Sequence, residues 1–464
     1  MKKSENRVPL WRSVLYSFGN AAGLLTYQTF NAFIQYFYTD VKGLPPHWVG
    51  RGWFAFGFWN AVNDPVAGWL SDQTSTRWGR RRFYIALLAI PVAVAFALVW
   101  MPPFDSDNPN ALFAYFLIII SIYDMLQSII TLNQDALFPE MYQETGNRAE
   151  GSSIRQFIGL FIGGGLAVAV TPTIYGHFGW TVLALLWGTL AAIMHLVSLI
   201  GIQENPAYAQ QEATVPWREQ VRLVFTNRSF MIVLGVNFVV RFILALLSAV
   251  LPFYGDYVLK IDESNLTILL LALSGTSGLS VLFWQLVIRR YGTRSTMITS
   301  MLIGGIFAIP LLFTASLTTT TIVLVLLGLA IGGTALGPDM LFAEVVDEDY
   351  VNTGKRREGM YRGIIGFVFR FPPAVAGLVL GEALSLAGYN ADLAVSAQPE
   401  AVNTIIRGFA SVLPLGATAI GVLLLVIYPL HGARLEEVQR LARAMRRATP
   451  PPGSQRVERP VTGD

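Results

Sequence analysis

Asp64 lies within an apolar segment, 47–71, in which the only other charged residue is Arg51. About 20 apolar residues are enough to cross the hydrocarbon core of a bilayer, so the segment is predicted to be a spanning helix that carries a carboxylate. Asp64 precedes Asp72 by eight residues, or about 12 Å at the rise of an α-helix, which places it deep in the membrane. An acid at that depth usually faces a cavity or a partner charge, although a polar contact between two helices would also satisfy it.

Two arginines interrupt later apolar segments, Arg241 in 229–256 and Arg370 in 361–388. A guanidinium group keeps its proton when it is buried, so each arginine needs a carboxylate or a water-filled cavity. Arg241 could instead extend its side chain to a membrane interface, and a structural role is favoured for it. The acids proposed as partners are Asp64, Asp124 and Asp135.

The segment 111–138 carries a polar stripe, because Asp124, Gln127, Thr131 and Asp135 recur at the spacing of one helix face. Lipid offers no partners to such groups, so the stripe should face a cavity inside the protein. Hydrogen bonding between helices, with no solute involved, would explain the same stripe. The segment 12–38 carries a sparser stripe, and the seven residues predicted to line a substrate cavity are Asn20, Tyr27, Asn31, Asp124, Gln127, Thr131 and Asp135.

The composition is that of an integral membrane protein: 53% of the 464 residues are hydrophobic and 14% are charged. An even number of apolar segments predicts that both chain ends lie on one side of the membrane. The twelve segments are 12–38, 47–71, 83–102, 111–138, 153–175, 180–202, 229–256, 263–288, 295–315, 319–344, 361–388 and 405–430.

Lysine and arginine collect in every second connection and at the two chain ends, whereas the opposite side offers only Lys42, Arg51, Lys260 and Arg407. Positively charged connections stay in the cytoplasm. The sequence therefore predicts a multi-pass protein of the plasma (inner) membrane with both termini cytoplasmic.

The longest internal polar connection divides the segments six and six. A short repeat supports this division, because RWGRR at 77–81 is echoed by RYGTR at 290–294, as in proteins built from two parallel repeats. The predicted parts are a first six-helix bundle at 1–202, a cytoplasmic linker at 203–227, a second six-helix bundle at 228–430 and a cytoplasmic tail at 431–464.

Several classes of function are not expected. The chain has no cysteine and its four histidines lack ligand spacing, so neither a disulfide nor a metal site is predicted. A nucleophile elbow and a phosphate-binding loop are missing from the sequence, which argues against an enzyme. No basic helix or base-stacking platform points to nucleic acid. The expected partners are a small-molecule solute and the lipid bilayer, and the chain is expected to be a monomer.

Residues 63–82, NDPVAGWLSDQTSTRWGRRR, and the acidic-then-basic stretch from Gly337 to Tyr361 carry a family resemblance. Two shorter matches are YTDV at 38–41 and ALFPE at 136–140. These stretches resemble the glycoside–pentoside–hexuronide:cation symporter family, which includes the melibiose permease and belongs to the major facilitator superfamily.

The resemblance implies an all-α major-facilitator fold, with twelve transmembrane helices in two six-helix bundles that rock about a central site. It places the family's characteristic second-helix acid at Asp64 and its intramembrane lysine at Arg370. Three positions depart from the well-studied members: Asn60, Leu24 and Thr131 stand where those proteins have acids. The resemblance therefore implies the scaffold but not galactoside specificity.

Asp64, Asn60 and Arg370 are the predicted cation-coupling residues, and no cofactor is expected beyond the coupling ion, H⁺ or Na⁺. A sodium site takes several hard oxygen ligands, and Asn60 supplies at most one neutral carbonyl oxygen. One carboxylate beside one fixed positive charge suits a proton that exchanges with an ion pair. We therefore predict proton-coupled or uncoupled transport rather than sodium coupling.

Charged residues in two predicted cytoplasmic connections are expected to form gating ion pairs between bundles or between loops and helices. Exposed ion pairs contribute only about 0–1 kcal/mol each, so a network is required. The residues are Asp72, Arg77, Arg80 and Arg81 in one half, with Asp347, Arg356, Arg357 and Glu358 in the other.

The sequence is thus interpreted as a cation symporter for a sugar, a glycoside or a related small organic solute. One alternative is a transporter of an amphipathic lipid such as a lysophospholipid. Another is a transporter-like sensor that binds solute without moving it.

Overall fold

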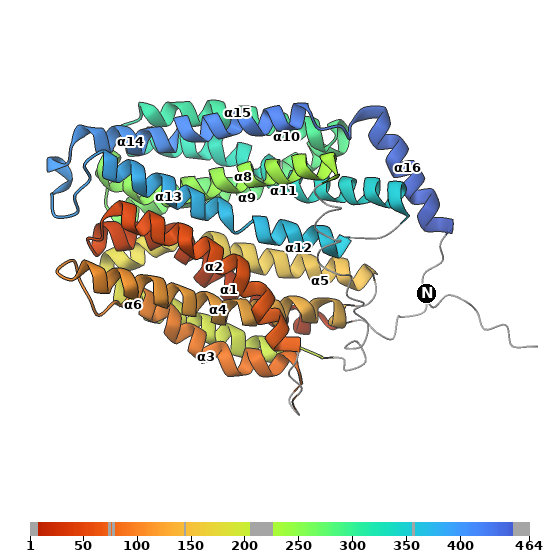
Figure 1. The fold of residues 1–464 in the computed structure, drawn as a ribbon, viewed down its shortest axis with the longest axis horizontal. Coiled ribbons are helices and arrows are strands. Elements are labelled where there is room, and N and C mark those ends of the chain that lie inside the picture. The colour runs from red at the N-terminus through yellow and green to blue at the C-terminus, as the bar shows by residue number, and fades with distance from the viewer. Residues whose placement is uncertain are drawn as a thin grey trace, which may run out of the picture.

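The computed structural model describes residues 8–72, 76, 79–142, 145–204, 226–354 and 358–448. Within these ranges the chain is built from helices that run side by side along the long axis of the molecule (Figure 1). The helices α1–α6 occupy the lower half of Figure 1, and α8–α15 occupy the upper half. This arrangement agrees with the predicted all-α, two-bundle architecture.

The first bundle contains two π-helical segments, Phe37–Val41 after α1 and Gly159–Leu166 between α5 and α6. The α-helices of this bundle are α1 (Leu10–Tyr36), α2 (Pro46–Asp72), α3 (Arg81–Val99), α4 (Pro109–Met141), α5 (Thr145–Ile158) and α6 (Ala167–Gly201).

The second bundle also contains a π-helical segment, Tyr254–Leu259, which directly follows α8. Its α-helices are α8 (Arg228–Phe253), α9 (Glu263–Tyr291), α10 (Thr293–Ala308), α11 (Leu317–Thr353), α12 (Glu358–Val368), α13 (Phe371–Leu386), α14 (Glu400–Ala410) and α15 (Val412–Val426), followed by α16 (Gly432–Ala448). Short 3₁₀ turns occupy Ile309–Leu312 and Val395–Ala397.

In the described part of the chain, nine helical stretches are long and apolar enough to cross a membrane. One of them, Glu150–Gly201, covers two predicted segments and is interrupted at Gly179, where φ is 80° and ψ is 165°. The two remaining predicted segments correspond to α1 and α2, with 27 residues each. Each of the twelve predicted segments is therefore matched by helical structure.

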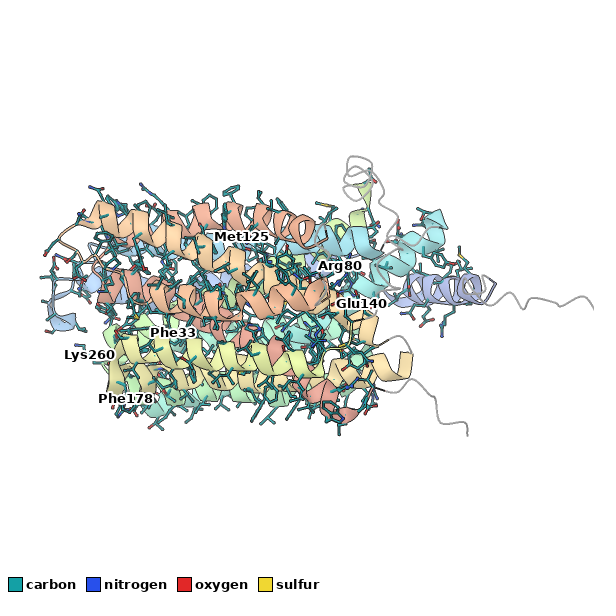
Figure 2. The ribbon with its side chains drawn as sticks, turned by 90° about the horizontal axis from the view of Figure 1, so that it is seen from below. Phe33, Arg80, Met125, Glu140, Phe178 and Lys260 are labelled. Atoms are coloured by element: carbon teal, nitrogen blue, oxygen red, sulfur yellow. The ribbon has the colours of Figure 1, made fainter. Side chains whose placement is uncertain are left out.

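The two ends of the molecule carry different residues (Figure 2). Phe178 and Lys260 lie at one end, and Arg80 and Glu140 lie at the opposite end, beside α16. We call these the Lys260 end and the Glu140 end. The first residues of α1 also lie at the Glu140 end, because the Tyr142 hydroxyl donates a hydrogen bond of 2.8 Å to Ser13.

Glycines allow α2 of the first bundle to approach α13 of the second bundle closely. A Cβ atom at Gly381 would lie 2.4 Å from the carbonyl oxygen of Pro46, and one at Gly377 would lie 2.4 Å from the Trp53 ring. Real side chains do not tolerate such distances, so these positions require glycine while the backbones remain this close. The contact fixes the relative position of the two bundles beside the candidate site.

Candidate functional site

A small pocket lies where α1 and α2 of the first bundle meet the start of α13. It has a volume of about 10 Å³, which is the space that one water molecule needs. Four predicted site residues from both bundles converge here, namely Tyr27, Asn31, Asn60 and Arg370. The remaining lining residues are Trp53, Phe56, Gly57, Pro373 and Ala374.

Arg370 occupies a break between two helices. It follows α12 and immediately precedes α13, whose second and third residues are Pro372 and Pro373. Prolines lack a backbone N–H and interrupt the hydrogen-bond ladder of a continuous helix. The break brings the Arg370 side chain to the pocket wall, at the positive end of the α13 dipole.

Two hydrogen bonds close the pocket on the side that faces the Lys260 end. The Nε2 atom of Gln35 donates to the carbonyl oxygen of Gly377 at 3.0 Å. The indole Nε1 of Trp53 donates to the carbonyl oxygen of Pro373 at 3.1 Å. Both bonds join the first bundle to the second, so the pocket lies directly beside a sealed part of the interface.

The predicted stripe on α4 divides into two parts. Asp124 is buried and accepts a hydrogen bond of 2.8 Å from Asn63 of α2. Gln127 is also buried and donates to the Thr131 hydroxyl at 3.1 Å. Thr131 and Asp135 are exposed, so only this part of the stripe is accessible to solvent.

Arg155 of α5 joins the exposed part of the stripe to α1. It forms an ion pair with Asp135 and donates a hydrogen bond of 3.1 Å to the Oδ1 atom of Asn20. Its guanidinium also lies 5.7 Å from the centre of the Phe138 ring. Arg155 was not predicted as a site residue and contributed only to the predicted charge bias, although its place inside the apolar segment 153–175 was a signal for such a role.

The predicted cation-coupling residues are described only in part. Asn60 is buried and Arg370 is half-buried, and both line the pocket. The side chain of Asp64 lies outside the described part of the structure. Asn63, its neighbour in sequence, contacts Asp124 of α4, and this contact was not predicted.

Arg241 of α8 does not reach a membrane interface. Its guanidinium lies over the ring of Phe369, 3.7 Å from the ring centre. Its electrostatic neighbours are Tyr27, Asp339 and Arg370, two of which line the pocket. Arg241 therefore belongs to the space between the bundles.

A tyrosine–aspartate cluster joins the bundles at the Lys260 end, and it consists of Tyr36, Asp40, Asp256, Tyr257 and Tyr389. The Tyr36 hydroxyl donates to Asp256 at 2.5 Å. Asp40 accepts hydrogen bonds from Tyr257 and, at 2.5 Å, from Tyr389. Burial and the Asp40 carboxylate raise the pKa of the Tyr389 hydroxyl above its usual value, so it stays protonated and donates.

Asp40 belongs to the family match at 38–41, but no role was predicted for it or for the tyrosines of this cluster. Three more contacts between the bundles lie near the cluster, again toward the Lys260 end. They are Arg51–Glu382 at 2.5 Å, Ser385–His47 at 2.9 Å and Thr173–Thr267 at 2.7 Å.

Three of the predicted gating residues, Arg80, Arg81 and Asp347, have described side chains, and they lie toward the Glu140 end. Arg81 forms an ion pair of 3.2 Å with Glu140 of α4, within the first bundle. The backbone N–H groups of Arg80 and Arg81 donate to Glu204 at 2.9 and 3.0 Å. Asp347 is half-buried in α11. The residues or side chains that fall outside the described part of the structure are Asp72, Arg77, Arg356, Arg357 and Glu358.

Comparison with known proteins identifies relatives that match along nearly the whole chain. Residues 15–432 match the family described as MFS/sugar transport protein. The isoprimeverose transporter of Lactiplantibacillus pentosus is 26% identical, and the match covers 94% of this chain and 92% of that protein. The glucuronide carrier protein homolog of Escherichia coli is 25% identical over 92% and 94%. The sodium-dependent lysophosphatidylcholine symporter 1-A of Danio rerio is 23% identical over 94% and 88%.

Solved structures share the fold. The crystal structure of the nucleoside transporter NupG superimposes with a TM-score of 0.63 at 15% identity, and covers 88% of this chain and 98% of that one. A bacterial homolog of the human lysosomal transporter Spinster, in an inward-facing and unoccupied conformation, gives a TM-score of 0.63 at 14% identity over 94% and 98%. These likenesses support the two-bundle fold and say nothing of the solute.

Proposed function

Because the chain belongs to the MFS/sugar transport protein family, we propose that it is a secondary active transporter of the plasma membrane. It moves a sugar, a glycoside or a related small organic solute by alternating access, and it acts as a monomer. The Glu140 end lies in the cytoplasm with both termini, because lysine and arginine collect in the connections of that end. The Lys260 end then faces outward.

The observation that carries the proposal is the position of the pocket relative to the seal. The described hydrogen bonds between the bundles gather toward the Lys260 end, from Gln35–Gly377 to Tyr389–Asp40. The described ion pairs at the Glu140 end, Arg81–Glu140 and Arg434–Glu348, each join helices of one half. A seal on one side of a central polar pocket is what rocking of two bundles about a fixed site requires.

The lining of the pocket suits a hydroxylated solute. Tyr27 offers a phenol, and Asn31 and Asn60 offer amides that can both donate and accept hydrogen bonds. The pocket has room for about one water molecule in this conformation. Solute binding therefore requires the helices around the pocket to separate, and the solute enters from the Glu140 end past Thr131 and Asp135.

For the coupling ion we propose a proton, with Asp64 as its carrier and Arg370 as the partner charge. Two lining residues of the pocket support this assignment. Asn60, one helical turn before Asp64, contributes an amide, and Arg370 contributes a fixed positive charge. A sodium ion would keep its positive charge beside Arg370 and be repelled, whereas a proton bonds to the carboxylate and leaves a neutral carboxyl group.

Cysteine labelling tests the solute path, because the native chain contains no cysteine. Single cysteines at Thr131 and Asp135 should react with a water-soluble maleimide added from the cytoplasmic side, and a transported solute should slow the reaction. Cysteine at the buried position Ile130 is the matched control on the same helix. Labelling at Ile130 as fast as at Thr131 and Asp135 would contradict the proposed path. So would a solute that raises the melting temperature without slowing the labelling at Thr131 and Asp135.

A thermal-shift screen identifies the solute class, since a ligand that binds the folded state raises its apparent stability. The screen contains sugars, glycosides, uronic acids and lysophospholipids. Each compound that stabilises the protein is then tested for uptake into proteoliposomes. Binding without uptake or exchange would reject transport in favour of a sensor.

The lysophosphatidylcholine symporter relatives support a second candidate function, transport of a lysophospholipid. That relative from Danio rerio matches 94% of this chain, a share equal to that of the isoprimeverose transporter. Stabilisation by lysophosphatidylcholine and not by any sugar would favour this candidate over the first.

A further inference from the structure

Arg241 occupies the middle of α8, which runs from Arg228 to Phe253. Either end of the helix is about 20 Å away at the helical rise, so the guanidinium is deep in the membrane-spanning part of the protein. A charged group at that depth is costly unless it faces water or a partner. The side chain is nevertheless exposed, and its neighbours from α1, α11 and the α12–α13 break place it between the bundles.

The Arg241 guanidinium packs against an aromatic ring. The Phe369 ring covers the face of the guanidinium at 3.7 Å, and a ring contact of this kind leaves the N–H groups at the edge of the guanidinium available. Among the side chains that the structure describes, which do not include that of Asp64, Arg241 forms no ion pair within 4.0 Å. It also donates no hydrogen bond to any described residue. Asp339 acts on it only over a longer distance.

We propose that Arg241 binds an oxyanion, a carboxylate or a phosphate, carried by the transported solute. The inference rests on the proposed function, because it assigns a chemical class to the cargo of that site. A guanidinium presents its donors as a planar fork that matches the two oxygens of such a group. The Phe369 ring holds this fork in place, so little side-chain freedom is lost when the anion binds.

The surroundings favour a negative charge at this position. Arg370 is a second guanidinium within electrostatic range of Arg241, and it stands at the positive end of the α13 dipole. The described charged neighbours of Arg241 are one positive group, Arg370, and one negative group, Asp339, and Asp339 acts only over a longer distance. With Asp64 assigned to Arg370 in the proposed function, an oxyanion on the solute would neutralise Arg241 itself. The sugar or lipid part of the same solute would then extend to Tyr27 and Asn31 in the pocket.

A cysteine at position 238 tests the local charge without knowledge of the solute. Phe238 is half-buried and lies three residues before Arg241, on the same face of the helix. The reaction rates of two methanethiosulfonate reagents of similar size are compared, one with a sulfonate and one with a trimethylammonium group. The rate of each reagent with the protein is divided by the rate of the same reagent with a free thiol. We expect the anionic reagent to be favoured by about fivefold or more.

The ratio of the anionic to the cationic reaction rate should fall toward one in Arg241→Gln. It should stay high in Arg241→Lys, which keeps the positive charge. Arg290→Gln is the matched control, because it removes one arginine from the same bundle at the Glu140 end of α9, where the side chain is exposed. No preference for the anionic reagent in the parent protein, or an equal loss in Arg290→Gln, would overturn the inference.

A second measurement identifies the source of the oxyanion. Methyl β-glucuronide, methyl β-glucoside, glucose 6-phosphate and lysophosphatidylcholine are compared in the thermal-shift assay. We expect an anionic sugar or the phospholipid to stabilise the wild type more than the neutral glucoside, and to lose that advantage in Arg241→Gln. The compound that behaves in this way shows whether the oxyanion is a sugar carboxylate, a sugar phosphate or a lipid phosphate.

Failure of the inference and failure of the proposed function give different results. Uptake of a neutral sugar at a rate unchanged in Arg241→Gln would keep the proposed function and overturn the inference. Stabilisation by an oxyanion with no uptake or exchange in proteoliposomes would reject transport, while the binding role of Arg241 would stand.

Discussion

Gln35 of α1 donates a hydrogen bond to the backbone carbonyl of Gly377 in α13, across the interface between the two bundles. The same glycine leaves room for the Trp53 ring, which would meet a Cβ atom at 2.4 Å. The contact therefore depends on the absence of a side chain at position 377. It lies between the pocket and the Lys260 end, where opening to the outside would have to begin.

Replacing Gly377 with alanine should weaken the seal. Inserting a methyl group into a packed contact costs about 1–3 kcal/mol, and separation of α2 from α13 relieves it. We expect a cysteine at Asn31 to become more reactive toward a reagent added from outside right-side-out vesicles. Gly408→Ala is the matched control, because a Cβ at Gly408 meets nothing within 4 Å. Equal labelling in the two variants would disprove the role of this contact.

Removing the two phenols that donate to Asp40 should shift the protein toward an outward-open state. Hydrogen bonds to a charged group contribute about 1.5–3 kcal/mol each, so Tyr257→Phe with Tyr389→Phe should raise labelling from outside more than either change alone. Labelling of the same Asn31 cysteine measures the effect. Tyr115→Phe serves as the control, since that phenol bonds to Leu98 within one bundle. A double variant that labels like wild type would show that the cluster does not hold the seal.

Asp64→Asn should separate accumulation from exchange. If Asp64 carries the coupled proton, the amide cannot release or take up that proton, so solute cannot be concentrated by a proton gradient. Exchange of labelled for unlabelled solute needs no net proton movement and should continue. Both are measured in proteoliposomes with an imposed pH gradient. Uptake that requires sodium at constant pH and does not respond to the proton gradient would contradict the proposal.

Glu140→Gln should destabilise the protein more than Glu382→Gln does. The side chains of the Arg81–Glu140 pair are 12% and 4% exposed, whereas those of Arg51 and Glu382 are 62% and 33% exposed. Breaking a buried pair costs about 3–5 kcal/mol because a buried charge loses its partner, and an exposed pair contributes about 0–1 kcal/mol. Thermal unfolding of the purified variants gives the comparison. Similar melting temperatures would show that the Arg81 charge finds compensation elsewhere.

The sequence predicted the helices and much of the pocket for a physical reason. A chain that crosses lipid needs long apolar helices, so hydropathy predicted the positions of the helices from α1 to α15. Polar residues inside these helices avoid lipid, and they therefore gather at the interface between the two bundles. Tyr27, Asn31, Asn60 and Arg370 do converge there. Position along a helix and polarity were the signals for Tyr27, Asn31 and Arg370, whereas Asn60 was predicted from the family resemblance.

Partner choice could not be predicted in the same way. Asn63 contacts Asp124, and Arg155 contacts Asp135. These pairs depend on which helix faces become neighbours when the helices pack, and a single sequence does not contain that information. The tyrosines around Asp40 gave no signal either, since tyrosine is common at membrane interfaces for reasons unrelated to any contact. The two prolines that follow Arg370 were a sequence signal for the break at this residue.

Main-chain carbonyls are the acceptors in the part of the seal beside the pocket: those of Gly377 and Pro373 accept hydrogen bonds from Gln35 of α1 and Trp53 of α2, and the carbonyl of Pro46 faces Gly381. Every amino acid supplies a carbonyl, so the accepting side of these hydrogen bonds does not depend on residue type. Mutations at pocket residues that do not belong to the seal, such as Asn31 and Asn60, can then accumulate without loss of these hydrogen bonds. The mechanical part and the recognition part of such a protein can change independently, and a single ancestral mechanism could thus be inherited by descendants with unlike cargo.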